Sequence, residues 1–236
     1  MATYLYSYVS YSRVLSGGDM QKTQVWDGFI RFFHWSMVAL IALLYYSAEN
    51  SLMELHFVAG FSLLSLLATR LIWGLIGSDT AKLSALIHSP KNTLAAIKGA
   101  PQETPGHNAA GSYMVIAFLI LLVAQAVTGL MTSDDIMYDG PLVAMVSGDL
   151  SSLAGSLHHQ IFDWLLIAIA LHITAIVVYK LKGKALVPPM ITGKTTESYK
   201  QNVKMKSGWI GFAIFCLLLA ALLTTWGAES VKTLLS

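Results

Sequence analysis

Five long apolar runs dominate this sequence and decide what it can fold into. They cover about residues 29–48, 55–76, 111–132, 157–179 and 208–226, and each can cross a hydrocarbon layer of about 30 Å as a helix. Lipid offers no partners to backbone amides, so runs of this Leu-, Ala- and Ile-rich kind must be helical. Only 12% of the 236 residues are charged, about half of what a soluble domain needs. The sequence therefore predicts an all-α integral membrane helical bundle.

Basic residues mark one side of the predicted membrane. All of the 15 Lys and Arg residues except Lys232 lie before or at the start of the first run, between the second and third runs or bordering them, or between the fourth and fifth. The other two loops carry acids instead, namely Glu49, Glu54, Asp134, Asp135, Asp139 and Asp149. The positive-inside rule then places the N-terminus on the cytoplasmic side and the C-terminus on the external side.

The connecting segments predict little independent structure. A short interfacial helix is expected around Pro90 to Ile97, after the Ser-Pro pair that would begin it. The external stretch 133–156 is rich in Gly, Asp and Ser and is expected to form a partly ordered cap. The basic stretch 186–207 is expected to lie on the anionic inner leaflet.

Five of the seven histidines lie in or at the ends of the apolar runs, namely His34, His56, His158, His159 and His172. A histidine within a membrane is costly and is therefore a functional candidate, although any one of them could equally be a plain interfacial hydrogen-bonder. With the topology above, two different helices contribute one histidine each at two depths. The inner pair is His34 with His172, and the outer pair is His56 with His158.

Helical phase supports this pairing. His158 and His172 are 14 residues apart, which is about 21 Å along a helix and within about 40° of the same direction. His159 would point some 140° away from His172, so we assign the ligand role to His158 and an interfacial position to His159.

The same spacing separates His56 from Arg70 on the second run. Arg70 is therefore expected at the depth of the inner pair, where a guanidinium needs an anion. A haem propionate or a carboxylate such as Asp79 would supply it. The alternative is that Arg70 extends to the inner headgroups.

Paired imidazoles from separate helices favour haem over other metal centres. Iron porphyrin with two imidazole ligands has no open site and suits electron transfer. Zinc or copper would need three or four converging donors, and the third run has no His or Cys. Gly60 and Gly129 are small enough for a flat macrocycle to lie against their helices, although glycine is common in membrane packing. No residue is predicted to act as a catalytic acid or base.

Several motifs, in this order, resemble those of the prokaryotic cytochrome b561 and nickel-hydrogenase b-type cytochrome family. They are Val25-Trp26-Asp27, Arg31 to Trp35, His56 to Gly60, Arg70 to Ser78, Gly106-His107-Asn108, the His158–His172 pair and Met190 to Gly193. The likeness extends over about residues 25–194.

The resemblance implies a four-helix core with two haem b groups, held by His34, His56, His158 and His172. It also implies that His107 and Asn108 contact a propionate or a quinone, with a purely structural role at the start of a helix as the alternative. The family's usual Glu after the outer ligand is His159 here, and a fifth span is added. These departures affect the surroundings of the outer haem and suggest a partner-docking helix.

Three regions follow from this reading. Residues 1–24 form a cytoplasmic extension without the apolar core of a signal peptide, with translation starting at Met1 or Met20. Residues 25–194 form the di-haem core, and residues 195–236 form a basic linker and the fifth transmembrane helix.

The resemblance implies a bacterial inner membrane, with the N-terminus in the cytoplasm and the C-terminus in the periplasm. It predicts electron transfer between membrane quinol or quinone and a redox partner, such as a periplasmic c-type cytochrome or a hydrogenase. No nucleic-acid partner is expected. A proton or metal-ion transporter with histidine relays is the alternative, but it predicts continuous polar residues between the two depths, where these runs are nearly all aliphatic. A membrane anchor whose haem takes no part in redox chemistry is a further alternative.

Overall fold

Four long membrane-type helices form the body of the protein. The structure is a computed structural model that describes residues 23–98, 104–197, 199 and 202–236. Within these residues the helices α2 (Gly28–Glu49), α3 (Met53–Ile76), α5 (Ala109–Leu130) and α6 (Gly148–Leu181) are long and apolar enough to cross a membrane. They contain or overlap the first four apolar runs, so the predicted all-α membrane bundle is confirmed. The expected extension, residues 1–24, lies outside the described residues except for its last two.

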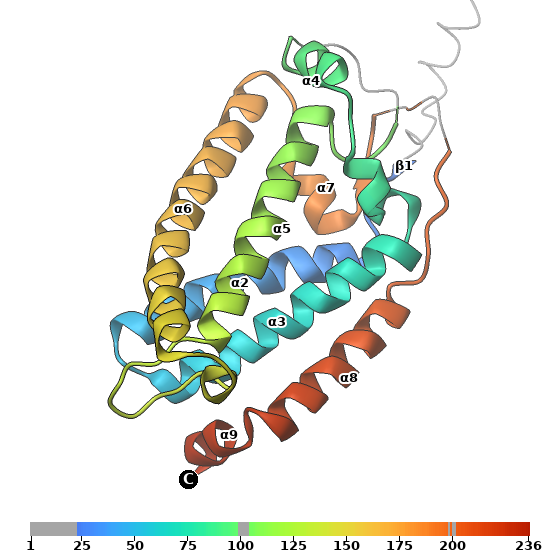
Figure 1. Ribbon diagram of the computed structural model, residues 1–236. Coiled ribbons are helices and arrows are strands. Elements are labelled where there is room, and N and C mark those ends of the chain that lie inside the picture. Colours follow the sequence, from blue (N-terminus) through green and yellow to red (C-terminus); the bar gives the residue numbers. More distant parts are fainter. Residues whose placement is uncertain (1–22, 99–103, 198, 200–201) are drawn as a thin grey trace, which may run out of the picture.

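The long helices pack as two pairs. α2 packs against α3, α5 packs against α6, and contacts between α3 and α5 join the pairs (Figure 1). A further helix, α8 (Trp209–Thr225), lies along α3 on the side of the bundle away from α6. The interior between the pairs is therefore bounded by α2 and α3 on one side and by α5 and α6 on the other.

The fifth apolar run is helical, as expected. α8 has 17 residues, or about 26 Å of helix, slightly less than a hydrocarbon core of about 30 Å. It is followed by α9 (Ala228–Leu235), which turns away by 85°. Whether α8 crosses the membrane stays a prediction.

α6 begins earlier than the sequence suggested. The expected span starts at residue 157, whereas the helix starts at Gly148 and has 34 residues. The hydroxyl of Ser147 caps its first turn by accepting a hydrogen bond from the Leu150 amide at 3.3 Å. At about 51 Å the helix is much longer than a hydrocarbon core. The loop between α5 and α6 is correspondingly short and holds the 3-10 helix η3 (Val143–Met145).

At the opposite end, short elements close the bundle. The predicted interfacial helix is present as α4 (Pro90–Ile97), after the 3-10 helices η1 (Asp79–Ala81) and η2 (Leu83–Leu86). The basic stretch after α6 forms α7 (Val187–Thr192) and strand β2 (Lys194–Thr195), which pairs with β1 (Thr23–Gln24) in antiparallel register. This stretch thus folds back onto the start of α2.

A buried carboxylate ties the inner ends of α2 and α3 together. Asp27 is 1% exposed; it caps α2 by accepting from the Ile30 amide at 2.8 Å and accepts from the Trp73 indole N–H at 3.0 Å. Around it packs a buried cluster that includes Phe29 and Leu66. The histidine-bearing faces of α2 and α3 are held in place by this cluster.

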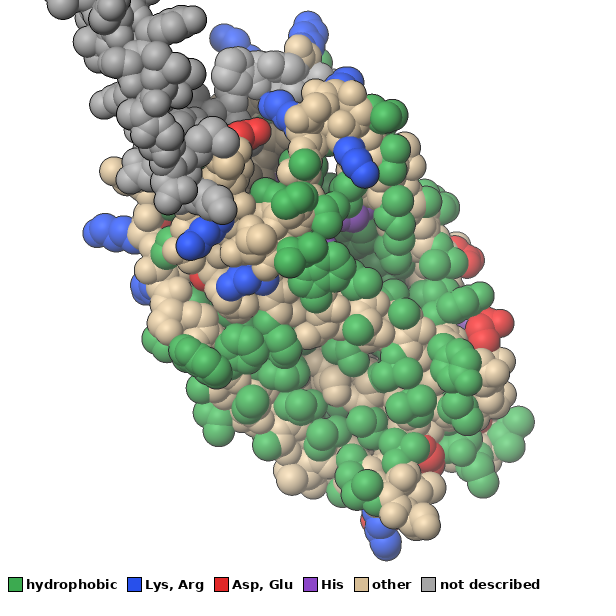
Figure 2. All heavy atoms as spheres, turned by 180° about the vertical axis from the view of Figure 1, so that it is seen from behind, with side chains coloured by type: hydrophobic (Ala, Val, Ile, Leu, Met, Phe, Trp, Pro, Cys, Tyr) green, Lys and Arg blue, Asp and Glu red, His purple; other side chains and the backbone are tan. Residues whose placement is uncertain are grey.

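The surface agrees with a protein that sits in lipid. Figure 2 shows Lys and Arg side chains gathered at the end that carries α4 and α7, with a broad hydrophobic belt below them. Large apolar side chains, such as Ile120, Leu171 and Leu217, are more than half exposed, which would be costly in water. Lipid is the surrounding in which such a surface is stable.

Candidate functional site

Two histidines lie close together at the end of the bundle opposite α4 and α7. His56 lies in the first turn of α3 and His158 lies ten residues into α6. Their ring centres are 6.4 Å apart, and the ring planes make an angle of 74°. Two helices far apart in sequence therefore bring their imidazoles close together.

Each of these rings is anchored through Nδ1. In His56, Nδ1 lies 3.1 Å from the Leu44 carbonyl oxygen and 3.2 Å from the Ser47 hydroxyl. In His158, Nδ1 lies 3.0 Å from the Gln125 carbonyl oxygen and 3.3 Å from the Thr128 hydroxyl. A carbonyl can only accept, so Nδ1 carries the proton in both rings. The lone pair of Nε2 is then left for a metal, as is usual for metal-binding histidines.

The spacing of the two rings fits a metal ion between them. Two metal–nitrogen bonds of about 2 Å, with about 1.1 Å from each nitrogen to its ring centre, place the ring centres about 6.2 Å apart. The observed 6.4 Å agrees with this value. Haem is the group implied by a site with two imidazoles and no third donor. No three His, Cys, Asp or Glu side chains come together as a metal site anywhere in the described part of the chain.

The two glycines that were expected to make room for a macrocycle differ in their surroundings. At Gly129 of α5, a Cβ atom would lie 2.8 Å from Cε1 of His158, so this glycine makes room for the imidazole itself. At Gly60 of α3, the nearest atom to a Cβ is in the Leu44 side chain at 4.0 Å. The surface over Gly60 is therefore open enough for a flat group.

His159 is placed differently from its neighbour. Its side chain is exposed, and its ring centre lies 6.3 Å from that of His158. Of these two histidines, His158 is the one whose ring packs near His56.

The inner histidines belong to a larger group of basic side chains. His34 on α2 and His172 on α6 lie close enough to interact electrostatically. Nδ1 of His34 is buried and has no hydrogen-bond partner among the described residues. The His172 ring stands edge-on to Phe118 with ring centres 5.7 Å apart. His34, unlike the outer histidines, thus has an Nδ1 without a carbonyl anchor.

His107 reaches the same group from the loop before α5. Its ring packs against Trp26 with centres 4.6 Å apart, and its Nδ1 is buried without a partner among the described residues. Burial, followed by the charges of Arg70, His172 and His34, lowers the pKa of His107 to about 3. The ring is therefore neutral at pH 7, and it offers one donor and one acceptor nitrogen.

Arg70 is buried at the inner level, where its spacing from His56 placed it. Its side chain is 4% exposed, which excludes an extension to the headgroups. Its guanidinium lies 5.9 Å from the centre of the Phe33 ring, and Nη1 is buried without a partner among the described residues. Asp27 is close enough to stabilise its charge. Asp79 does not serve it, because that carboxylate pairs with Lys82 at 2.7 Å.

Asn108 is engaged in local structure. Its side-chain oxygen caps α5 by accepting from the Gly111 amide at 2.7 Å, and its amide group donates to the Tyr179 hydroxyl at 2.8 Å. These contacts correspond to the structural alternative that the sequence left open.

Sequence reasoning did not identify the groups that orient the outer rings. The Leu44 and Gln125 carbonyls carry no sequence signal, because every residue has one. Asp27 could have been found, since an Asp before an apolar helix is a typical N-cap.

A helical membrane bundle with paired histidines from different helices defines a class, that of membrane proteins holding a metal centre between helices. A family model described as prokaryotic cytochrome b561 matches residues 25–193, and the chain belongs to this family. A comparison with curated proteins finds no match. The family makes the protein a transmembrane b-type cytochrome that binds haem b and takes part in electron transfer.

Proposed function

We propose that this protein is a di-haem cytochrome b that transfers electrons between membrane quinol or quinone and a redox partner protein. His56 and His158 would hold the outer haem, and His34 and His172 the inner one. The observation that carries the proposal is the outer pair, whose rings have the spacing that one iron requires and whose Nδ1 atoms are both tied to carbonyls.

Bis-imidazole haem supplies a one-electron centre that changes charge without gaining or losing a ligand. The chain contributes by keeping the ligand rings still. The carbonyls of Leu44 and Gln125 belong to helices of the bundle. They would fix the tautomer and orientation of both rings in the oxidised and the reduced protein alike. Such preorganisation favours electron transfer over chemistry at an open metal site.

Unpartnered polar groups support a second haem at the inner level. Arg70 Nη1, Thr80 Oγ1, His107 Nδ1 and His34 Nδ1 are all buried without hydrogen-bond partners among the described residues. A buried guanidinium is costly unless it meets an anion. The two propionates of a haem are the anions that such a group would accept, with Arg70 as the charged donor and His107 as a neutral one.

The external cap would receive the redox partner. Asp134, Asp135 and Asp139 lie in the loop after α5, where Ile136 is 92% and Met137 76% exposed. An apolar tip with acidic neighbours suits a basic protein such as a c-type cytochrome, because opposite charges raise association rates. A hydrogenase-like partner would use the same face, which lies next to the outer histidines.

The region boundaries and orientation complete the proposal. Residues 25–194 would form the haem-binding core, preceded by the cytoplasmic extension 1–24. Residues 195–236 would add the linker and a fifth span that ends in the periplasm. The inner membrane and this orientation are supported by the basic residues at the α4 end.

Spectra of the purified protein test the function. Two haem b per chain, and a reduced-minus-oxidised difference spectrum that quinol can generate, are the expected results. A proton or metal-ion transporter would show no b-type absorbance. A membrane anchor whose haem takes no part in electron transfer would show b-type absorbance, but quinol would not reduce its haem. Either result would contradict the proposal.

A further inference from the structure

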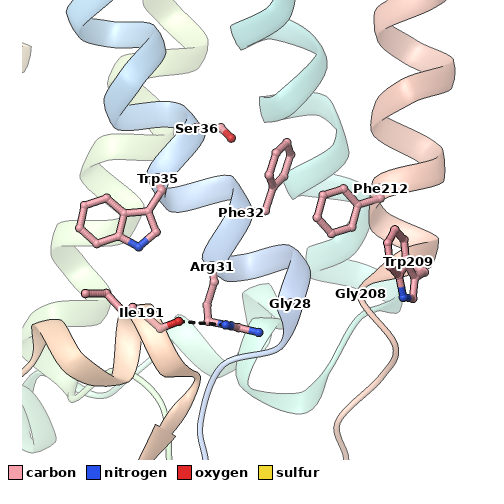
Figure 3. Close-up of a pocket in the computed structure, with 9 residues that line it drawn as sticks. All are labelled: Gly28, Arg31, Phe32, Trp35, Ser36, Ile191, Gly208, Trp209 and Phe212. Atoms are coloured by element: carbon pink, nitrogen blue, oxygen red, sulfur yellow. Dashed lines mark hydrogen bonds between the residues drawn. The ribbon is translucent and has the colours of Figure 1, made fainter.

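A groove opens on the outer surface of the bundle between α2, α7 and the start of α8 (Figure 3). Its volume is about 470 Å³. It lies at the end of the molecule where the basic residues gather, and it is separate from the buried groups around His107 and Arg70. On a membrane protein this is the level of the inner headgroups.

Arg31 supplies the charge in this groove. Its Nη1 donates to the Ile191 carbonyl at 2.9 Å, and its Nε to the Asp27 carbonyl at 3.4 Å. Both partners are neutral, and no carboxylate of the described residues forms an ion pair with it. A guanidinium has five donors, so three remain for a ligand. The groove therefore holds a positive charge that the described protein does not neutralise.

Aromatic side chains form the rest of the lining. Trp35 is 44% and Trp209 78% exposed, and Phe32 and Phe212 pack together with ring centres 4.5 Å apart. Figure 3 shows Arg31 below, with Trp35 on one side and the aromatic rings of α8 on the other. Exposed tryptophans such as these two are typical of the membrane interface, where polar lipid headgroups meet the apolar acyl chains.

The groove exists because α8 begins very close to α2. A Cβ at Gly208 would lie 2.5 Å from the Phe29 amide nitrogen, and one at Gly211 would lie 2.5 Å from the Phe29 ring. These two glycines let α8 start against the first turn of α2, which brings Trp209 and Phe212 beside Arg31. The fifth helix is thus part of the site.

We propose that this groove binds an anionic phospholipid. The phosphate would accept hydrogen bonds from Arg31, and an acyl chain would lie against Phe32, Phe212 and the two tryptophans. A zwitterionic headgroup such as phosphocholine carries the same phosphate together with a cation that the guanidinium would repel, so net negative charge is what this groove should favour. The site is independent of the proposed electron-transfer function, because it uses none of the residues assigned to haem.

Native mass spectrometry of the full chain in mild detergent tests this assignment. Phosphatidylglycerol and phosphatidylcholine with identical acyl chains are titrated separately. We expect the wild type to bind phosphatidylglycerol about fivefold more tightly, as one basic residue at a membrane surface predicts. Arg31→Gln should remove this preference, whereas Arg31→Lys should keep most of it.

Two further variants separate lipid binding from misfolding. Trp209→Ala should weaken binding of both lipids, since it removes part of the wall without changing the charge. Lys232→Gln, a lost cation at the other end of the molecule, should leave binding unchanged. The haem absorbance of each variant reports that it has folded, and Arg31→Lys with Trp209→Ala decide the matter if Arg31→Gln does not fold.

Three results would overturn the proposal. The first is equal binding of the two lipids by the wild type, and the second is a preference that survives in Arg31→Gln. The third is displacement of phosphatidylglycerol by a neutral quinone analogue, which would assign the groove to quinone.

Discussion

At the scale of single residues, the outer histidines are oriented by backbone atoms. A helix carbonyl has two lone pairs, so Leu44 and Gln125 can bond within their helices and still accept from a histidine of a neighbouring helix. Such an acceptor cannot be removed by changing a side chain. The Nδ1–H of both rings therefore donates to a backbone carbonyl that remains in place when side chains are substituted.

The histidine variants test the assignment of ligands. His56→Ala and His158→Ala should each lose the outer haem and keep the inner one, while His34→Ala and His172→Ala should do the reverse. His159→Ala should keep both, because its exposed ring has a different position from that of His158. Pyridine haemochrome counts the haem left per chain, and redox titration of the intact variants identifies which haem remains, because the two variants of each pair should keep the same one. Loss of the outer haem from the His172 variant alone would refute the pairing.

Gly129→Ala should lower the haem content of the outer site. The added methyl would lie 2.8 Å from the His158 ring, so the ring must move out of line with His56. Gly155→Ala is the matched control, since its methyl would meet only Thr132 at an ordinary 3.5 Å. Absorbance of the outer haem per chain is compared in the two variants. Equal haem in both would show that the ring has room to shift.

At the scale of elements, the segment before α8 is tethered to the end of α3. Asp79 accepts from the Lys204 amide at 2.9 Å and from the Lys82 ammonium at 2.7 Å. The hydrogen bond from Lys82, followed by that from Lys204, lowers the pKa of Asp79 below its ordinary 3.8. This exposed carboxylate therefore links the η1 turn to the segment that leads into the fifth helix.

The tether should depend on pH in a defined direction. A carboxylate with a lowered folded pKa stabilises the folded contact above pH 3.8 and loses this effect as pH falls through its folded pKa. Asp79→Asn should therefore speed hydrogen exchange of the Lys204 amide roughly threefold to fivefold at pH 6, and have no effect at the lowest pH. Glu229→Gln, at the opposite end, is the control. An effect that persists at pH 2 would rule out the charge as its cause.

A larger side chain at Gly211 should weaken the packing of α8 on α2. Gly211→Leu places side-chain atoms into the Phe29 ring, and overpacking of this kind costs about 1–3 kcal/mol. The control, Ala213→Leu, introduces a leucine side chain at an exposed position of the same helix. The melting temperature, followed by haem absorbance in detergent, should fall by several degrees in the first variant only. Equal melting temperatures of the two variants would show that α8 does not pack tightly against α2.

At the scale of the whole molecule, the side of the membrane on which the C-terminus lies depends on whether α8 spans the membrane. If α8 crosses the membrane, the C-terminus lies in the periplasm. Alkaline phosphatase fused after Ser236 should then be active, because its disulfides form only outside the cytoplasm. The same enzyme fused after Lys98 should be inactive. An inactive C-terminal fusion, with the chain expressed, would mean that α8 does not span.

The membrane bundle could be predicted because it depends on hydrophobic length, which is a property of one segment at a time. Apolar runs of about 20 residues specify spanning helices. The 14-residue spacings led to the choice of His158 over His159 and to the expected depth of Arg70. The structure brings His158 close to His56 and Arg70 close to His107, and the ligand roles stay predictions. The early start of α6 could not be predicted, because its Gly-, Asp- and Ser-rich first turns resemble a loop, and the Ser147 cap is what makes them helical.

The sequence by itself determined that this chain is a helical membrane protein, and its charge pattern and histidine spacing supplied the predictions of orientation and of histidine depth. These properties follow from hydrophobic length, charge and helical repeat, all of which act along one segment at a time. Only the tertiary structure decided which carbonyls hold the rings, that Arg70 is buried near Asp27, and that Arg31 lies in a groove with α8. Those contacts join segments far apart in the chain, and they depend on how helices pack.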